Sequence, residues 1–181
     1  AGTVWTKAAA ATNGDLLLDN NTFSGTTTQV AAATWTVNDL TLKNAAMFVI
    51  PSGATVNVAG TLANFTSGVT LTNNGTLSIT GVVPAFPTGG STLTNNGSLS
   101  LAATTTLTNI TLIQNGTLTT LTTLTLGSGA TLDFQNLTST TAFTLTDLTI
   151  QSGGSLTHKA ASTNMLNLAI TSNLTVDAGG T

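Results

Sequence analysis

Few residues of this chain are able to do chemistry, and they lie far apart in the sequence. His158 is the only histidine, and the chain has no cysteine to complete a metal site with it, so we expect a structural or solvated role. The carboxylates are all aspartates, and their spacing matches no calcium-binding loop. They are Asp15, Asp19, Asp39, Asp133, Asp147 and Asp177. Asp39 and Asp147 each precede Leu-Thr, which favours a turn-capping role. We therefore expect no enzyme activity, no metal ion and no cofactor.

The composition favours a β protein that interacts little through charge. Only 5% of the 181 residues are charged, Arg and Glu are absent, and the net charge is -3. Thr is the most frequent residue, and Thr, Asn and Gly suit strands and turns rather than helices. Three lysines cannot supply the phosphate contacts of a nucleic-acid-binding protein. The longest apolar run, residues 45–50, is far shorter than the about 20 residues of a membrane-spanning helix. We therefore expect neither nucleic acid binding nor a membrane span.

One short pattern recurs along the chain. The stretch 71-LTNNGTLSITG-81 returns as 93-LTNNGSLSLAA-103 and, in shorter form, as 113-IQNGTLTTL-121. Similar units place a glycine between two runs of alternating apolar and Thr residues, at a spacing of roughly 20 residues. The expected turn residues are Gly53, Asn74, Gly75, Asn96, Gly97, Asn115, Gly116, Gly129 and Gly153. The uneven spacing of these glycines is interpreted as loops of varying length at one corner of a coil.

The alternation within each unit predicts a β-solenoid. In 144-TLTDLTI-150, Leu and Ile point to one side of a strand and polar residues to the other. Such units cannot bury their apolar side alone, whereas a stack of them can. We expect one domain, residues 1–181, with a less regular segment at 1–35 that caps or joins subunits. The repeats at 36–181 would form about seven to nine coils. An antiparallel β-sandwich is the alternative, because Asn-Gly between alternating strands is also a strong hairpin signal.

The Asn-Gly pairs have two expected roles in the turns. Both residues tolerate a positive φ, so each pair can turn the chain sharply from one strand into the next. Stacked turns would also place Asn74, Asn96 and Asn115 above one another, where their amides can form a ladder.

The pattern 34-TWTVNDLTLKNAAMFVIPSGATVNVAGTLANF-65, followed by LTNNGTLSI, resembles the repeats of bacterial right-handed parallel β-helices. Proteins of this kind include autotransporter passengers and filamentous-haemagglutinin-type exoproteins. The resemblance implies a right-handed parallel β-helix in a secreted or cell-surface protein. The small residue Ala1 suits a chain from which a signal peptide has been removed.

The two ends of the sequence suggest how such a protein would act. Residues 172–181 stop in the middle of a repeat, and the first residues, AGTVWT, carry the alternation that the missing half needs. We therefore expect Val4 and Trp5 of one subunit to meet Leu174 and Val176 of the next in a head-to-tail homopolymer. The low charge offers little repulsion against self-association.

Two other functions remain open. In the first, the chain is the stalk of a surface adhesin that contacts a host surface or a polysaccharide. Pairs such as Thr70/Thr72 and Thr92/Thr94 also suggest an ice-binding array, although uneven coil spacing would spoil its match to a lattice.

Overall fold

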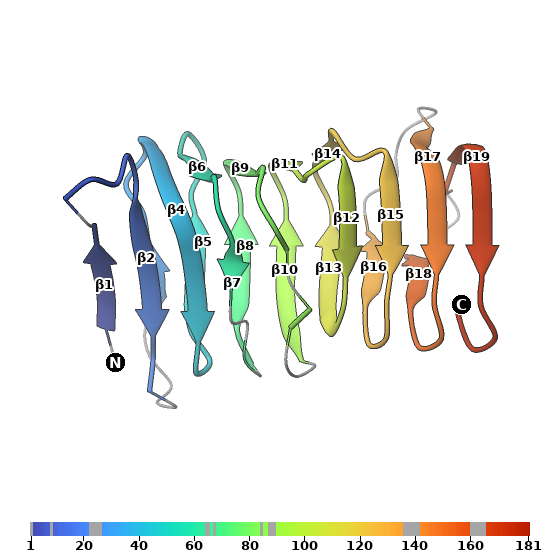
Figure 1. Cartoon of the computed structure of the whole chain (residues 1–181), viewed down its shortest axis with the longest axis horizontal. Coiled ribbons are helices and arrows are strands. Elements are labelled where there is room, and N and C mark those ends of the chain that lie inside the picture. Colours follow the sequence, from blue (N-terminus) through green and yellow to red (C-terminus); the bar gives the residue numbers. More distant parts are fainter. Residues whose placement is uncertain are drawn as a thin grey trace.

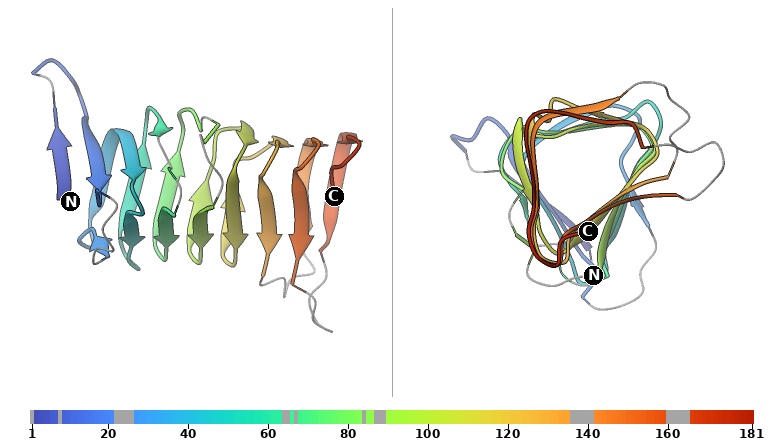
Figure 2. Two further views of the ribbon diagram at one scale, coloured as in Figure 1. Left: turned by 90° about the horizontal axis from the view of Figure 1, so that it is seen from below. Right: turned by 90° about the vertical axis from the view of Figure 1, so that its right-hand side faces the viewer.

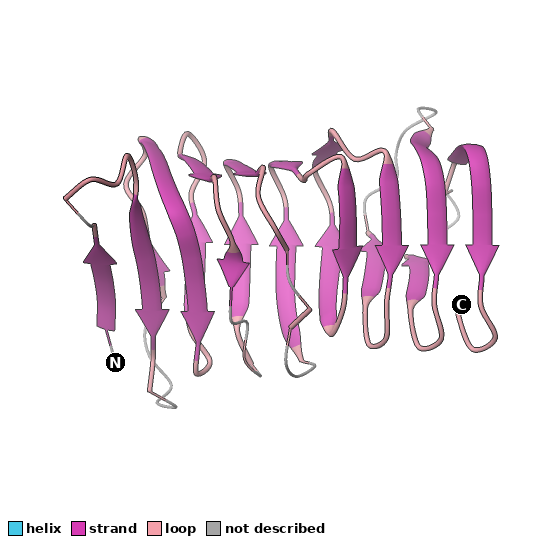
Figure 3. Ribbon diagram, viewed as in Figure 1, coloured by secondary structure: helices cyan, strands magenta, loops and turns pink. Residues whose placement is uncertain are grey.

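Alternating side chains set the architecture of the computed structural model. The structure describes residues 2–7, 9–21, 27–63, 66, 68–83, 85–86, 90–135, 142–159 and 166–181. Its secondary structure there consists of strands and no helix (Figure 3). In β8 (Thr70–Asn73) and β10 (Ser91–Asn95), the single leucine is buried and the threonine on each side of it is half-buried. The apolar side of each strand therefore faces inward, and the Thr side faces outward.

The strands form three sheets that wrap around one long axis and give a three-sided outline when viewed along it (Figure 2). The seven-stranded sheet contains β3 (Thr28–Gln29), β5 (Met47–Ile50), β8, β10, β13 (Ile110–Gln114), β16 (Thr131–Phe134) and β18 (Ser155–His158). The eight-stranded sheet contains β1 (Gly2–Thr6), β2 (Gly14–Asp19), β4 (Thr34–Lys43), β6 (Thr55–Val58), β7 (Leu62–Ala63), β9 (Thr76–Ile79), β11 (Ser98–Ser100) and β14 (Thr117–Thr119). The four-stranded sheet contains β12 (Thr104–Leu107), β15 (Thr123–Leu126), β17 (Phe143–Ile150) and β19 (Leu168–Val176).

Neighbouring strands belong to successive coils and run parallel. Leu71 of β8 lies beside Leu93 of β10, which lies beside Leu112 of β13. Among the described strands, only β1 pairs antiparallel, with β2. Parallel stacking begins with β2 and continues to β19 (Figure 1). The predicted solenoid is therefore confirmed, and the antiparallel sandwich is excluded.

The predicted number of coils was too high. The solenoid has about 6 turns, with a period of about 22 residues, instead of seven to nine turns. The glycine pattern occurs at two different corners, which inflated the count. Gly97 and Gly116 lie where the seven-stranded sheet passes into the eight-stranded sheet, and Gly129 and Gly153 lie where the four-stranded sheet passes into the seven-stranded one. The short step from Gly116 to Gly129 is thus a change of corner rather than a short coil.

The Asn-Gly corners need glycine for a different reason from the predicted one. Gly75, Gly97 and Gly116 do not have the left-handed φ that was expected of them, whereas Gly53 does, with φ 80°. A Cβ atom built on Gly97 would lie 2.1 Å from the carbonyl oxygen of Gly75 in the preceding coil. Glycine is therefore required at these three corners by the close approach of stacked backbones.

Columns of apolar side chains fill the interior. One column runs along the seven-stranded sheet and consists of Phe48, Leu71, Leu93, Leu112 and Leu132, all of which are buried. Each member packs between its neighbours in the coils before and after it. A single coil would leave these side chains in water, so the stack as a whole supplies the hydrophobic stabilisation.

Candidate functional site

The N-terminal end of the solenoid is covered by β1. Trp5 on β1 lies opposite Leu16 of β2, an inward-facing residue. A Cβ on Gly14 would lie 2.7 Å from a carbon of the Trp5 indole, so the ring packs directly on this glycine. Trp5 and Trp35 line a pocket of about 340 Å³ with Phe48 at the end of the core. Trp5 thus lies over the first coil, and it remains 47% exposed.

The C-terminal end exposes the last members of two core columns. Leu174 of β19 lies beside the buried Leu148, and Val176 lies beside the buried Ile150. Leu174 and Val176 are nevertheless 56% and 52% exposed. Their exposure arises because no described strand pairs with the outer edge of β19. This end of the core is therefore open.

The two outermost strands lie on the same side of the solenoid. β1 pairs with residues 15–19, the part of β2 that lies beside residues 40–43 of β4. This side continues through β7 to the four-stranded sheet and ends at β19 (Figure 1). The structure thus places Val4 and Trp5 at one end and Leu174 and Val176 at the other, and it brings the two pairs together nowhere within one chain.

The exposed asparagine ladder is confirmed. Asn96 donates its side-chain amide to Asn74 at 2.8 Å, and Asn115 donates to Asn96 at 2.8 Å. These hydrogen bonds link three successive Asn-Gly corners on the exposed surface of the solenoid.

A second, buried ladder lies one residue earlier in the chain and was not predicted. Asn73 donates to Asn95 at 2.7 Å, and Asn95 donates to Gln114 at 3.0 Å. All three side chains are buried. The sequence does carry a signal for this ladder, because Asn73 and Asn95 have the same inward phase as Leu71 and Leu93.

Two aspartates link neighbouring coils outside the two asparagine ladders. Asp39 accepts a hydrogen bond from the backbone N–H of Thr61 at 2.6 Å, and Asp147 accepts one from the backbone N–H of Asn173 at 3.2 Å. Asp39 therefore holds the backbone at the corner between β6 and β7, in keeping with the predicted turn-capping role. Asp147 and Asn173 both lie within strands, beside the irregularity between β17 and β19, so Asp147 links two strands and does not cap a turn. The side-chain amide of Asn173 also donates to Asp147 and is the main reason why the pKa of this aspartate is lowered.

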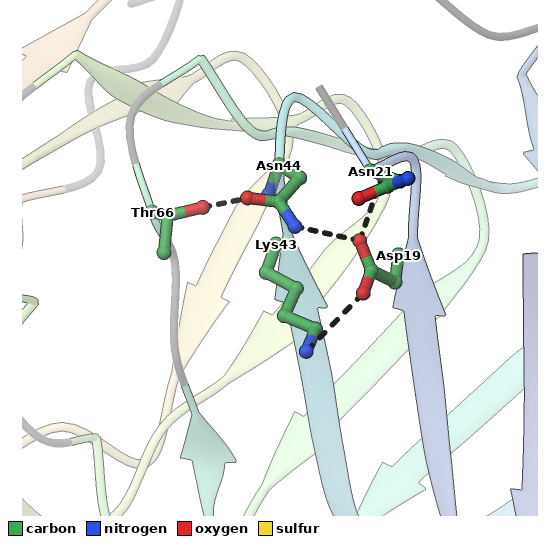
Figure 4. Close-up of polar contacts among 5 residues, drawn as sticks. All are labelled: Asp19, Asn21, Lys43, Asn44 and Thr66. Atoms are coloured by element: carbon green, nitrogen blue, oxygen red, sulfur yellow. Dashed lines mark hydrogen bonds and ion pairs between the residues drawn. The ribbon is translucent and has the colours of Figure 1, made fainter. Parts of the chain in front are cut away.

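A polar cluster around Asp19 joins three coils near the N-terminal end (Figure 4). Asp19 accepts hydrogen bonds from the Asn44 side chain at 2.7 Å and from the Asn21 backbone at 2.8 Å, and it forms an ion pair with Lys43 at 3.2 Å. The backbone N–H of Asn44 donates to Thr66 at 2.7 Å. The Asn44 amide, followed by the Asn21 N–H, lowers the pKa of Asp19 to about 2.

We expect this cluster to weaken in acid. The pKa of Asp19 is lower in the folded chain than its ordinary value of 3.8, so its stabilising effect is complete above that value and is lost as the pH falls towards about 2. The difference in urea midpoint between the native chain and an Asp19→Asn variant should therefore shrink across that interval. Asp177→Asn, which lies outside the cluster, serves as the control. A difference that stayed constant from pH 6 to pH 2 would show that the ionised form of Asp19 contributes nothing.

The described residues contain no constellation typical of an active site. No group of three or more His, Cys, Asp or Glu side chains lies together in them. His158 is exposed on β18, and its imidazole forms no hydrogen bond or ion pair within the part of the chain that the structure describes. The described residues also include no helix long and apolar enough to cross a membrane.

Comparison with known proteins returned no match to a family model, to a curated protein or to a solved structure. The β-solenoid architecture agrees with the fold that the sequence resemblance implies. The candidate site is therefore the pair of exposed strand edges at the two ends of the solenoid, those of β1 and β19.

Proposed function

We propose that this chain is a structural protein that joins end to end with copies of itself, through the outer edge of β1 in one copy and that of β19 in the next. One observation carries the proposal. Both outermost strands lie on the same side of the solenoid, and neither contains a charged residue or a proline. Proteins usually protect exposed strand edges with charges, prolines or bulges. The irregularity in β19 lies between Ile170 and Asn173, so residues 173–176 keep a regular edge that is available for pairing.

The joint would extend the sheet by backbone hydrogen bonds. Because β1 runs antiparallel to β2 and all later coils run parallel to β2, β1 would pair antiparallel with β19 of the neighbouring copy. Trp5 and Thr3 face inward on β1, as Leu174 and Val176 do on β19. Pairing would therefore bring Trp5 against the open end of the core and remove these apolar side chains from water.

The surface and the charge of the chain support a role outside the cell. The net charge is only -3, so copies repel one another weakly. The outer surface is rich in Thr, Ser and Asn, in keeping with the resemblance to bacterial exoprotein repeats. A filament subunit of this exoprotein type is the proposed identity, and a stalk that carries a host-binding or polysaccharide-binding tip is the alternative.

Lysine placed at either edge should block the joint. We expect Val4→Lys on β1 and Leu174→Lys on β19 each to weaken self-association by about tenfold or more, equivalent to about 1.4 kcal/mol. Val4 faces outward on β1, where a lysine on an exposed strand edge opposes pairing with another strand. Leu174 faces inward on β19, so a lysine there would be buried in the joint. Sedimentation velocity over a range of protein concentrations measures the effect. Thr125→Lys, on the outer face of β15 in the middle of the same side, is the matched control.

A mixture of the two edge variants gives the sharper test. Val4→Lys keeps a native β19 edge, and Leu174→Lys keeps a native β1 edge. Together they should form dimers and nothing longer, because each dimer presents a lysine at both outer ends. Equal association of the native chain, both edge variants and the control would overturn the proposal.

A further inference from the structure

We propose that the outer face of the seven-stranded sheet binds the surface of ice. Its centre is a set of outward-facing threonines on four adjacent strands, which we call the threonine lattice. The lattice consists of Thr70, Thr72, Thr92, Thr94, Thr111 and Thr131. This surface lies along the side of the solenoid and is independent of the end-to-end joint proposed above.

The threonine lattice is regular even though the sequence repeats are not. Thr70 pairs with Thr92, Thr92 with Thr111, and Thr111 with Thr131, without any shift in register. The uneven lengths of the coils are taken up at the corners and leave the strands aligned. The hydroxyls therefore repeat about every 4.8 Å across the strands and about every 6.6 Å along them. The expectation that uneven coil spacing spoils a lattice does not apply to this face.

The hydroxyls of the threonine lattice are free to bind water. None of them forms a hydrogen bond with another residue that the structure describes. Two outward residues of the eight-stranded sheet differ, because Ser100 bonds to Thr120 at 2.9 Å and Thr119 donates to the Leu99 carbonyl at 3.4 Å. Each free hydroxyl offers one donor and two acceptors to ordered water. This contrast favours the threonine lattice over the part of the eight-stranded sheet around Ser100 and Thr119.

The lattice is also stiff and carries methyl groups beside its hydroxyls. Thr is branched at Cβ, which restricts its side chain, and these threonines are half-buried between their neighbours. Val49 and Ile113 lie in the same column as Thr72 and Thr94 and extend the row of methyl groups. Little side-chain entropy would be lost when such a surface orders a layer of water.

The chemistry of this face favours ice over a polysaccharide. Sugar surfaces are commonly bound by exposed Trp, Tyr or Phe rings, whereas the two phenylalanines in the strands of this sheet, Phe48 and Phe134, are buried. Charged groups hold their own hydration shells, and the lattice contains none, although Asp133 bounds it beside Ile113. The regular array of uncharged hydroxyl and methyl groups offers repeating hydrogen-bond donors and acceptors to the water layer on an ice plane.

Thermal hysteresis and inhibition of ice recrystallisation, measured on the purified chain, test the proposal. We expect the native chain to show both activities. Thr92→Lys, at the centre of the lattice, should lose most of them, because the long side chain holds the sheet away from a flat surface. The control is Thr76→Lys, at a half-buried outward position of the eight-stranded sheet, which should keep them. Thermal unfolding monitored by circular dichroism verifies that both variants are folded.

Three results would overturn the proposal. The native chain could lack both activities, or the two lysine variants could lose them equally. Alternatively, the native chain could bind insoluble cellulose or chitin through Thr92 without acting on ice, which would identify a polysaccharide surface instead. End-to-end joining does not involve these threonines, so the edge variants Val4→Lys and Leu174→Lys should keep both ice activities while they lose self-association. The two proposals can therefore fail independently of each other.

Discussion

Gly97→Ala should destabilise the solenoid by about 3 kcal/mol, at the upper end of the usual cost of overpacking. The added Cβ would lie 2.1 Å from the carbonyl oxygen of Gly75 and 2.9 Å from the carbonyl carbon of Asn74. Both are backbone atoms, so no side-chain rotation can relieve the contact, and two coils must move apart. The midpoint of urea unfolding, compared at an unchanged slope, measures the loss.

Gly53→Ala is the matched control for this prediction. Gly53 has a left-handed φ of 80°, yet a Cβ there would have no neighbour closer than 3.9 Å. The substitution should cost only about 1 kcal/mol of backbone strain. If Gly53→Ala proved as damaging as Gly97→Ala, or more so, conformation rather than close approach would be what requires glycine at the Asn-Gly corners.

Asn95→Ala should also cost about 3 kcal/mol, because it leaves buried polar groups without partners. The Asn95 side chain donates to Gln114 and to the Thr117 carbonyl, each at 3.0 Å, and accepts from Asn73 at 2.7 Å. Asn95→Asp tests the same site electrostatically. Burial of a carboxylate raises its pKa, so this variant should be most stable in acid and should lose stability as the pH rises through that pKa.

Asn96→Ala provides the comparison on the exposed ladder. Asn96 also bonds to asparagines in both neighbouring coils, at 2.8 Å each, but water can replace these bonds. Its loss should cost less than about 1 kcal/mol in urea unfolding. Equal losses of stability from Asn95→Ala and Asn96→Ala would contradict the inference that burial makes the inner ladder the more stabilising one.

The alternation in the sequence was sufficient to predict the solenoid and the inward and outward sides of its strands. In Leu71-Thr72-Asn73 the phase alone determines which residues are buried, and the recurrence of Asn-Gly predicted the exposed amide ladder. Alternation is a local property, and it is preserved when strands stack in either direction. It could therefore not reveal that β1 runs antiparallel to β2.

The sequence could not show which corner of a coil each glycine turn occupies. A glycine between two alternating strands looks the same at every corner, so Gly116 and Gly129 were placed in one series although they belong to two. The cluster around Asp19 was missed for a related reason. Asp19, Asn44 and Thr66 meet because their corners stack, and the irregular sequence around them gives no repeat by which to align them.

Cysteine cross-linking between copies tests end-to-end assembly most directly. The chain contains no cysteine, so Val4→Cys on β1 and Thr175→Cys on β19 introduce the only thiols. These positions lie at opposite ends of one solenoid and cannot be joined within a single chain (Figure 1). Under mild oxidation the double variant should give a ladder of multimers on denaturing gels. Pairing Val4→Cys with Thr125→Cys, in the middle of the solenoid, should not. Monomers alone, or an equal ladder from the control pair, would contradict assembly through the β1 and β19 edges.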